Sequence, residues 1–191
     1  MLGTHNSLSY LKPLKWWQRW STPWSKCQSL TLEEQYNYGV RYFDFRLRYD
    51  NNDKMWYFVH NRVKYDIVNN LYFSYLNHQS DKSYIRFILD QRKKPKDKLA
   101  EYEIKNFTDY VNEIKRTYKN IIIDSAIIYW TWTDILKPSV IVLEDHTSVK
   151  SKWYQYILGT KWYAKKNNRR PYIENKAAYI DDDKVLLLDY I

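Results

Sequence analysis

A histidine lies almost at the start of the chain, at position 5 of the polar stretch Gly-Thr-His-Asn-Ser (residues 3–7). Histidine titrates closer to neutral pH than any other side chain, so it is the default proton carrier in enzymes. One histidine needs partners before it can do chemistry. These are a second proton carrier, a cation for an anionic transition state and a carboxylate that orients the ring. The sequence offers all three, and they recur where predicted strands end.

The segment 40–48 alternates as a strand does. One predicted face carries Tyr42, Asp44, Arg46 and Arg48, and the other carries Phe43, Phe45 and Leu47. Charged groups on an inward face are costly unless they are used. A second strand, 55–60, ends in His60, and further predicted strands end near Asp90, Glu144 and Asp189.

Strands and helices are predicted to alternate along the rest of the chain. The helices are expected at 14–20, 31–39, 64–79, 97–118 and 149–165, the strands at 84–90, 121–129, 139–146 and 185–190, and a loop or helix start at 130–133. Thr31, followed by two glutamates, is a typical N-cap for the second of these helices. This order with nearly continuous apolar strands favours a parallel sheet covered by helices, and α/β barrels build their sites at the carboxyl ends of such strands.

Composition limits the class of protein. The 191 residues suit one domain, and one cysteine, Cys27, allows no internal disulfide framework. The formal net charge of +9 favours a polyanion as partner, either nucleic acid or an anionic membrane. No aromatic–basic RNA motif or groove-reading helix is visible, so nucleic acid is not expected. The sequence shows neither a signal peptide nor a membrane-spanning run, and the compartment stays open.

Tryptophan and tyrosine are abundant, with 9 and 20 copies. Three of the tryptophans, Trp16, Trp17 and Trp20, stand close together beside Lys12, Lys15 and Arg19. They either pack on the core or form a rim that enters a lipid interface. The sequence leaves both interpretations open.

The stretches 3–7, 39–48 and 59–60 closely resemble the X-domain of phosphatidylinositol-specific phospholipase C, with the bacterial type nearest. The end of the chain, 188–191, is similar to the last barrel strand of these enzymes. The resemblance implies that residues 1–191 form a single small, irregular or incomplete TIM-type α/β barrel, shorter than the ~250 residues of a typical one. Its first strand is expected to be largely missing, because only two residues precede Gly3, and this would leave an open edge.

The resemblance also implies roles. In the family, the inositol 2-hydroxyl attacks phosphorus and gives a cyclic phosphate and diacylglycerol. By this likeness, the catalytic residues are His5 as general base, His60 as general acid, Arg46 as phosphate clamp, Asp189 as the orienter of His5, Asp44 as a holding group, and Asn6. Asp90 and Glu144 are expected at the substrate. Each of these residues also has an ordinary structural interpretation, such as a scaffold ion pair for Arg46 with Asp44.

The chain departs from the family pattern at several positions. Bacterial members usually have Asp where Asn6 stands, and calcium-dependent relatives carry Asn there as a metal ligand. Asp44 and Asp90 would then be further oxygen ligands of Ca²⁺. Arg46 replaces a carboxylate of those relatives, which favours a mechanism without metal. The arginine expected to bind substrate after the middle strand is absent, and Glu144 begins the polar group in its place.

The leading hypothesis is therefore a phosphodiesterase or lyase that acts on a phosphoinositide-type lipid headgroup, as a monomer on a membrane surface. One alternative is a metal-dependent glycerophosphodiesterase or sphingomyelinase D-like enzyme on a related barrel. The other is a degenerate barrel that binds anionic lipid without turnover.

Overall fold

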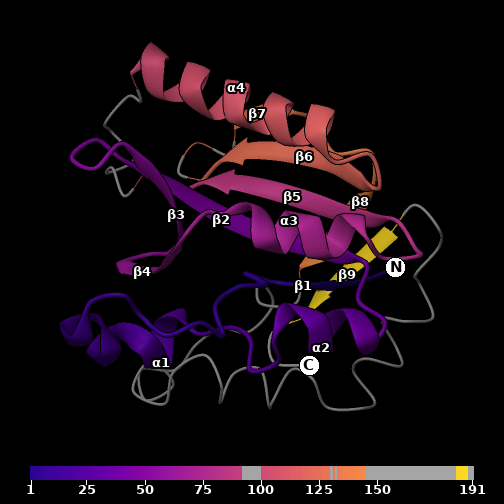
Figure 1. The fold of residues 1–191 in the computed structure, drawn as a ribbon, viewed down its shortest axis with the longest axis horizontal. Helices are drawn as coiled ribbons and strands as arrows, with labels where there is room; N and C mark the ends of the chain where they lie inside the picture. The colour runs from indigo at the N-terminus through magenta and orange to yellow at the C-terminus, as the bar shows by residue number, and fades with distance from the viewer. Residues whose placement is uncertain (92–99, 130, 132, 145–183, 189–191) are drawn as a thin grey trace.

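The computed structural model describes residues 1–91, 100–129, 131, 133–144 and 184–188. Nine strands and five helical segments follow one another along these residues (Figure 1). The strands are β1 (Leu2–Thr4), β2 (Tyr42–Asp50), β3 (Met55–His60), β4 (Val63–Ile67), β5 (Ser83–Leu89), β6 (Ile121–Ile128), β7 (Thr133–Leu136), β8 (Ile141–Glu144) and β9 (Lys184–Leu188). The helices are the 3₁₀ helix η1 (Trp16–Ser21), α1 (Thr22–Ser25), α2 (Leu32–Asn37), α3 (Asn70–Asn77) and α4 (Glu101–Thr117).

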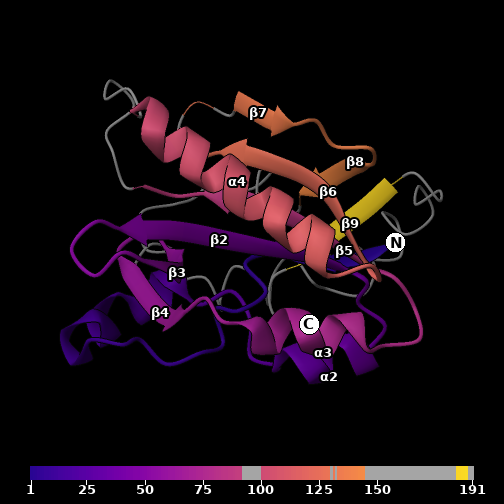
Figure 2. The same cartoon turned by 45° about the horizontal axis from the view of Figure 1, so that its top comes forward.

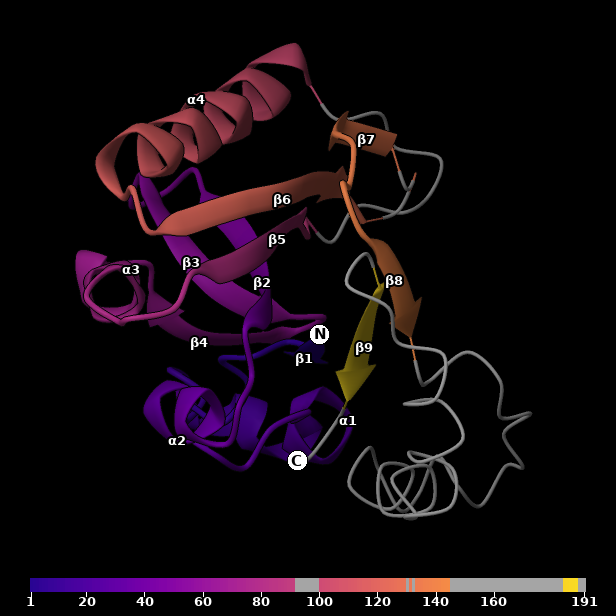
Figure 3. The ribbon, with the colours of Figure 1, turned by 90° about the vertical axis from the view of Figure 1, so that its right-hand side faces the viewer.

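The strands form one curled sheet in the order β7-β6-β5-β2-β1-β9-β8. In this spatial order, every neighbouring pair between β6 and β8 is parallel. Strand β7 runs antiparallel to β6, and β3 and β4 form an antiparallel hairpin that pairs with β2. Seen along the curl, α2, α3 and α4 lie outside it, and β8 and β9 form the opposite wall (Figure 3). The predicted incomplete barrel is confirmed.

The predicted alternation of β2 is confirmed and sets the two sides of the wall. Phe43, Phe45 and Leu47 are buried in the main core between the sheet and the helices, where Phe45 packs against Phe73 of α3 at 5.9 Å between ring centroids. Helix α4 covers the neighbouring strands of the same face (Figure 2). Tyr42 points the other way, into the inside of the curl. The charged residues of β2 share that inner side, because side chains alternate along a strand.

The first strand is short, as expected, but it leaves no edge open beside it. Gly3 in β1 is in register with Tyr42 of β2 on one side and with Leu187 of β9 on the other. A Cβ on Gly3 would stand 2.6 Å from a methyl group of Leu187 and 2.9 Å from one of Val185, so the missing side chain is what lets β1 fit between its neighbours. The edge strands of the described sheet are β7, β8 and, beyond the β3–β4 hairpin, β4.

The predicted helix 64–79 is wrong over its first part, because residues Val63–Ile67 form β4, the hairpin partner of β3. Asn61, in the turn between the two strands, has a φ of 52°, a left-handed conformation that asparagine tolerates. Val63 and Tyr65 are buried with the period of two that is typical of a strand, and Leu71 at the start of α3 is 74% exposed.

The other predicted elements agree more closely with the structure. Thr31 caps α2, and Glu34 closes a capping box with it. Helix α4 lies within the range predicted for it. Thr133, expected in a loop or helix start, begins strand β7 instead. The helix predicted at 149–165 lies outside the described residues. Among the described helices, none combines the length and the apolar character needed to cross a membrane.

Candidate active site

The turn that carries His5 follows directly from β1. The backbone N–H of His5 donates to the carbonyl of Leu188 at the end of β9, at 3.0 Å. The N–H of Ser7 donates to the carbonyl of Asp44 at 2.9 Å, and the hydroxyl oxygen of Ser7 accepts from the N–H of Asp44 at 2.9 Å. Between them, Asn6 has a φ of 44°. The turn is therefore fixed to both neighbours of β1 at the place where His5 projects.

Two buried glutamines, which sequence reasoning missed, hold this turn from outside the sheet. The side-chain N–H₂ of Gln28 donates to the carbonyls of His5 (3.1 Å) and Leu188 (2.7 Å). The side chain of Gln35, in α2, donates to the carbonyl of Ser7 and accepts from the hydroxyl of Thr4, both at 2.8 Å. The sequence around each glutamine gives no sign of such a role, because the hydrogen-bond partners lie far away in the sequence.

Asp44 is fully buried and lies at the centre of the charged groups. Its two carboxylate oxygens accept from Nε of Arg86 at 3.1 Å and Nε of Arg46 at 3.4 Å, and from the backbone N–H of Asn6 at 3.0 Å. Burial by itself raises the pKa of this carboxyl, but the guanidinium groups of Arg86 and Arg46 hold the pKa well below its usual value. Asp44 is therefore an anion that orders the residues around it.

Arg86 was not among the predicted site residues. The alternation of β5 puts it on the inner side of the sheet, in register with Asp44 on β2. The strand itself was predicted, but its pairing with β2 could not be read from local sequence. Arg86 also lines a cavity of about 430 Å³ inside the curl, together with Ser125, Ile127 and residues 138–142.

Arg46 joins the carboxylate to His5. Its Nη2 hydrogen-bonds Nε2 of His5, and the same Nε2 lies 3.8 Å from the carboxylate of Asp44. A guanidinium can only donate, so Nε2 of His5 is the acceptor and its proton sits on Nδ1. Arg46 also lies over the ring of Tyr129, with 5.2 Å to the ring centroid. Burial lowers the pKa of Arg46, but Asp44 raises it above the ordinary value, so the group keeps its charge.

His60, at the end of β3, faces His5 across the site. The two ring centroids are 6.2 Å apart and the ring planes are at 84°. Nδ1 of His60 lies 2.7 Å from the carbonyl oxygen of Ser25 and 3.6 Å from Sγ of Cys27. Both histidines are 6% exposed. The structure therefore places His5, Asn6, Asp44, Arg46 and His60 close together.

Asp90 is engaged elsewhere. Its carboxylate accepts from Nη2 of Arg48 and from the backbone N–H of Asn61, both at 3.1 Å, so it ties the β3–β4 hairpin to β5. It stands four residues beyond Arg86, the residue in register with Asp44, which is ~13 Å along the strand. The alternative calcium set of Asn6, Asp44 and Asp90 does not fit this geometry, because both carboxylates are bound to arginines and are too far apart to share one ion.

Two predicted residues cannot be placed. Asp189 lies outside the described residues, and the side chain of Glu144 lies outside them as well, although its backbone belongs to β8. In the described part of the chain, no group of three His, Cys, Asp or Glu side chains is arranged to hold a metal ion.

The tryptophan segment, residues 12–20, lies below the β3–β4 hairpin (Figure 1). Trp16, Trp17 and Trp20 are 73%, 50% and 79% exposed, so they do not pack on the core. Gln18 between them is buried; it donates to the carbonyl of Arg62 at 2.8 Å and fixes the segment to the hairpin. Pro23 is accommodated in the first turn of α1, where its missing N–H costs no hydrogen bond.

No family model and no curated protein sequence matches the chain. Solved structures do match over its whole length. Two mutants of the phosphatidylinositol-specific phospholipase C from Staphylococcus aureus align with TM-scores of 0.62 and 0.63, identities of 16% and 15%, and coverage of 85% and 84% of their chains. The phosphatidylinositol-specific phospholipase C from Listeria monocytogenes aligns with a TM-score of 0.55 at 12% identity, over 87% of its chain. The resemblance drawn from the sequence is thus confirmed in the architecture: the chain has the fold of the bacterial phosphatidylinositol-specific phospholipases C.

Proposed function

We propose that this protein is a phosphodiesterase that cleaves the headgroup of a phosphatidylinositol-type lipid by intramolecular attack. The observation that carries the proposal is the contact of His5 Nε2 with Arg46, beside a second buried histidine at 6.2 Å. A base, a cation and an acid are the groups that such a reaction needs. The chain also has the fold of enzymes named for this activity.

In the proposed reaction, His5 accepts the proton of the headgroup hydroxyl as its oxygen bonds to phosphorus. The bond from phosphorus to the glycerol oxygen breaks, and His60 gives a proton to the departing alkoxide. The products are a cyclic phosphate and diacylglycerol. Before this, the phosphate competes with Nε2 of His5 for the guanidinium of Arg46, so arrival of the anion releases the lone pair of the base.

The side chain of Asn6 is a further argument for an anionic ligand in this site. Its side-chain nitrogen is buried and has no hydrogen-bond partner among the described residues, although the backbone of Asn6 is bound to Asp44. An unused buried N–H₂ group costs about 1–3 kcal/mol, which a phosphate oxygen would recover. Asn6 is thereby assigned the role of a neutral donor beside Arg46.

The lipid surface is proposed as the site of action. The exposed tryptophans carry apolar area and an N–H group, which suits the boundary between headgroups and acyl chains. Lys12, Lys15 and Arg19 in the same segment are exposed and add attraction for anionic lipid. One structural neighbour from Staphylococcus aureus is described in terms of its membrane binding.

The test is hydrolysis of phosphatidylinositol in mixed micelles, followed by diacylglycerol release and by ³¹P NMR of the cyclic phosphate. We expect His5→Ala and His60→Ala each to lower the rate by about 10²-fold or more. His78→Ala, at the exposed C-cap of α3, is the matched control and keeps the rate. Activity that persists in chelator excludes the metal-dependent diesterase. A folded protein that binds the micelles and yields no product contradicts the proposal and supports a lipid-binding barrel.

A further inference from the structure

The ring of His60 is held by a segment distant in sequence. Its Nδ1 is 2.7 Å from the carbonyl oxygen of Ser25. A carbonyl oxygen can only accept, so Nδ1 must carry a hydrogen in the neutral ring as well as in the protonated one. The neutral ring is then the Nδ1–H tautomer, and Nε2 is the nitrogen that gains a proton when the ring becomes charged.

The Ser25 carbonyl is itself firmly placed. Ser25 is the last residue of α1, and its carbonyl also accepts from the hydroxyl of Tyr65 on β4 at 2.6 Å. The hydroxyl oxygen of Ser9 accepts from the backbone N–H groups of Cys27 (2.8 Å) and Gln28 (3.0 Å). The acceptor is therefore fixed by hydrogen bonds on both sides before any ligand arrives.

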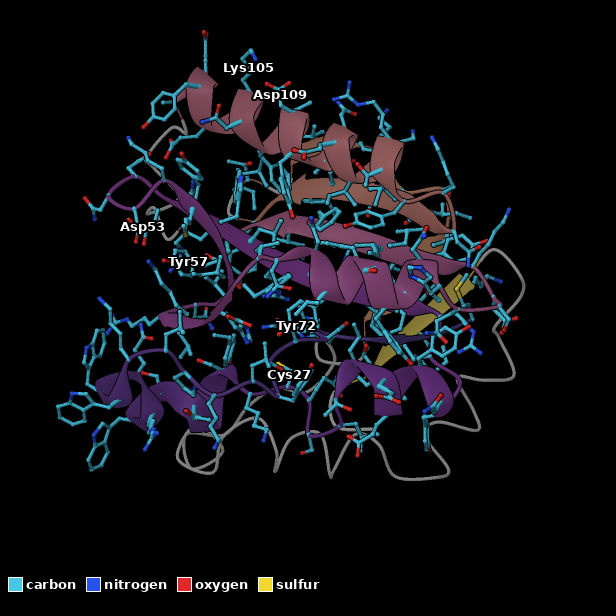
Figure 4. All side chains as sticks on the ribbon, in the orientation of Figure 1. Cys27, Asp53, Tyr57, Tyr72, Lys105 and Asp109 are labelled. Carbon is cyan, nitrogen blue, oxygen red and sulfur yellow. The ribbon has the colours of Figure 1, made fainter. Side chains whose placement is uncertain are left out.

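Cys27 is the second group at the same nitrogen. Its Sγ is 3.6 Å from Nδ1 of His60, and the residue is 1% exposed. Figure 4 shows Cys27 in the interior, on the side of α1 and α2, far from Lys105 and Asp109 on the outer surface of α4. Because Nδ1 carries a hydrogen that points to the Ser25 carbonyl, it has no lone pair to accept a hydrogen from the thiol. The sulfur of Cys27 therefore acts as a second, weaker acceptor of the Nδ1 hydrogen.

The choice of a thiol follows from the neighbouring charge. Cys27 is close enough to Arg46 to affect the pKa of that guanidinium, after the larger effects of burial and Asp44. A carboxylate at this position would pair with Arg46 and take it away from a phosphate. A sulfur atom orients the imidazole as a weak acceptor and cannot form the bidentate ion pair that a carboxylate would form with Arg46.

We propose that Cys27, together with the Ser25 carbonyl, fixes His60 as the Nδ1–H tautomer, and that Cys27 is a positioning residue for the proton donor. The assignment of the tautomer depends only on the geometry of these contacts. Only the naming of His60 as the proton donor rests on the proposed function.

The experiment is ¹⁵N NMR of the full chain with labelled histidine, without any lipid. His60→Gln assigns the ring signals, and His78 serves as an internal control, because its Nδ1 faces the carbonyl of Ser74 at 2.6 Å on the surface. We expect His60 to be mainly the Nδ1–H tautomer. Cys27→Ala should lower its tautomer ratio by about twofold to fivefold, the loss of one weak hydrogen bond, and Cys27→Ser should restore it. His78 should not change.

A wild-type His60 in the Nε2–H form overturns the proposal. Wild-type signals in Cys27→Ala overturn the role of Cys27. If the alanine variant does not fold, Cys27→Val, which keeps the volume and removes the acceptor, replaces it. Because no substrate is present, an inactive protein with an Nδ1–H His60 contradicts the proposed function and not this inference. Where activity is measurable, Cys27→Ala should lower kcat by a similar factor with KM unchanged.

Discussion

At the scale of the residue, the described part of the site is a buried cluster of charged side chains around one carboxylate. One carboxylate, Asp44, faces the guanidinium groups of Arg46 and Arg86, and His5 accepts from one of them in its neutral form. Buried charges are tolerated when they are paired, and Asp44 supplies such a partner to both arginines.

Asp44→Asn tests this arrangement through pH. The folded-state pKa of Asp44 is depressed, so its ionised form stabilises the fold above the unfolded pKa of about 3.9, and this stabilisation is lost as pH falls toward the folded pKa. At pH 7 we expect the variant to lose about 3 kcal/mol, because two buried guanidinium groups lose their counter-charge. Urea unfolding at pH 7 and at pH 3 should show the difference from wild type shrinking at the lower pH. An equal difference at both values contradicts the proposed state of Asp44.

At the scale of the element, three strands each contribute one residue to the site. His5 follows β1, Arg46 lies within β2 and His60 ends β3. Strand β1 contributes only three residues, so its position depends on Gly3 and on the glutamine contacts of the turn. A short strand between two parallel neighbours can move the turn after it if its packing is disturbed.

Gly3→Ala is therefore expected to displace His5. The added Cβ would meet two methyl groups of β9, on Leu187 and Val185, and the Cβ of Tyr42 on β2, at 2.6–3.1 Å, so it would be confined between both neighbouring strands. We expect a loss of about 1–3 kcal/mol in urea unfolding and lower phosphodiesterase activity at temperatures where the variant is folded. Gly39→Ala is the control: its φ of 102° makes it unfavourable in the backbone, but its Cβ meets no atom within 4 Å. It should lose stability and keep activity per folded molecule. Full activity in folded Gly3→Ala contradicts this role of β1.

At the scale of the whole molecule, charge and aromatic area lie together on one segment. The chain has a net charge of +9, and the tryptophan segment lies on the opposite side of the molecule from α4 in both views of the long axis (Figures 1 and 2). The same segment continues through α1 to Ser25, which contacts His60. The segment proposed to contact lipid is thus connected through α1 to the residue that holds the proposed proton donor, His60.

Trp16→Ala and Trp20→Ala should each weaken binding to anionic vesicles by about tenfold, the loss of part of an aromatic side chain's transfer free energy. Added salt should weaken binding of the wild type as well, because surface charges are screened. Co-sedimentation with phosphatidylserine vesicles measures both effects. Tyr102→Ala, at a 53% exposed position of α4, is the control and should bind as the wild type does. Equal losses in all three variants would exclude a specific role for the tryptophan segment.

The sequence by itself determined what depends on local periodicity and local capping. The alternation of β2 fixed the side on which Asp44 and Arg46 lie, because successive side chains of a strand point to opposite faces. Thr31 and Glu34 fixed the start of α2, because an N-cap and its partner are three residues apart. The set of His5, Arg46 and His60 could be named from these patterns and from the family resemblance.

Only the tertiary structure decided what these residues touch. Arg86 meets Asp44 across 42 positions of sequence, and His60 meets the carbonyl of Ser25 across 35. Gln28 joins His5 to Leu188, at a separation of 160 residues from the latter. Hydrogen bonds and ion pairs of this kind have no local signature, because the residues next to a polar side chain in sequence do not show whether it is solvated or buried. The choice between a strand and a helix at 63–67 had the same origin, because pairing with β3 outweighed the local pattern.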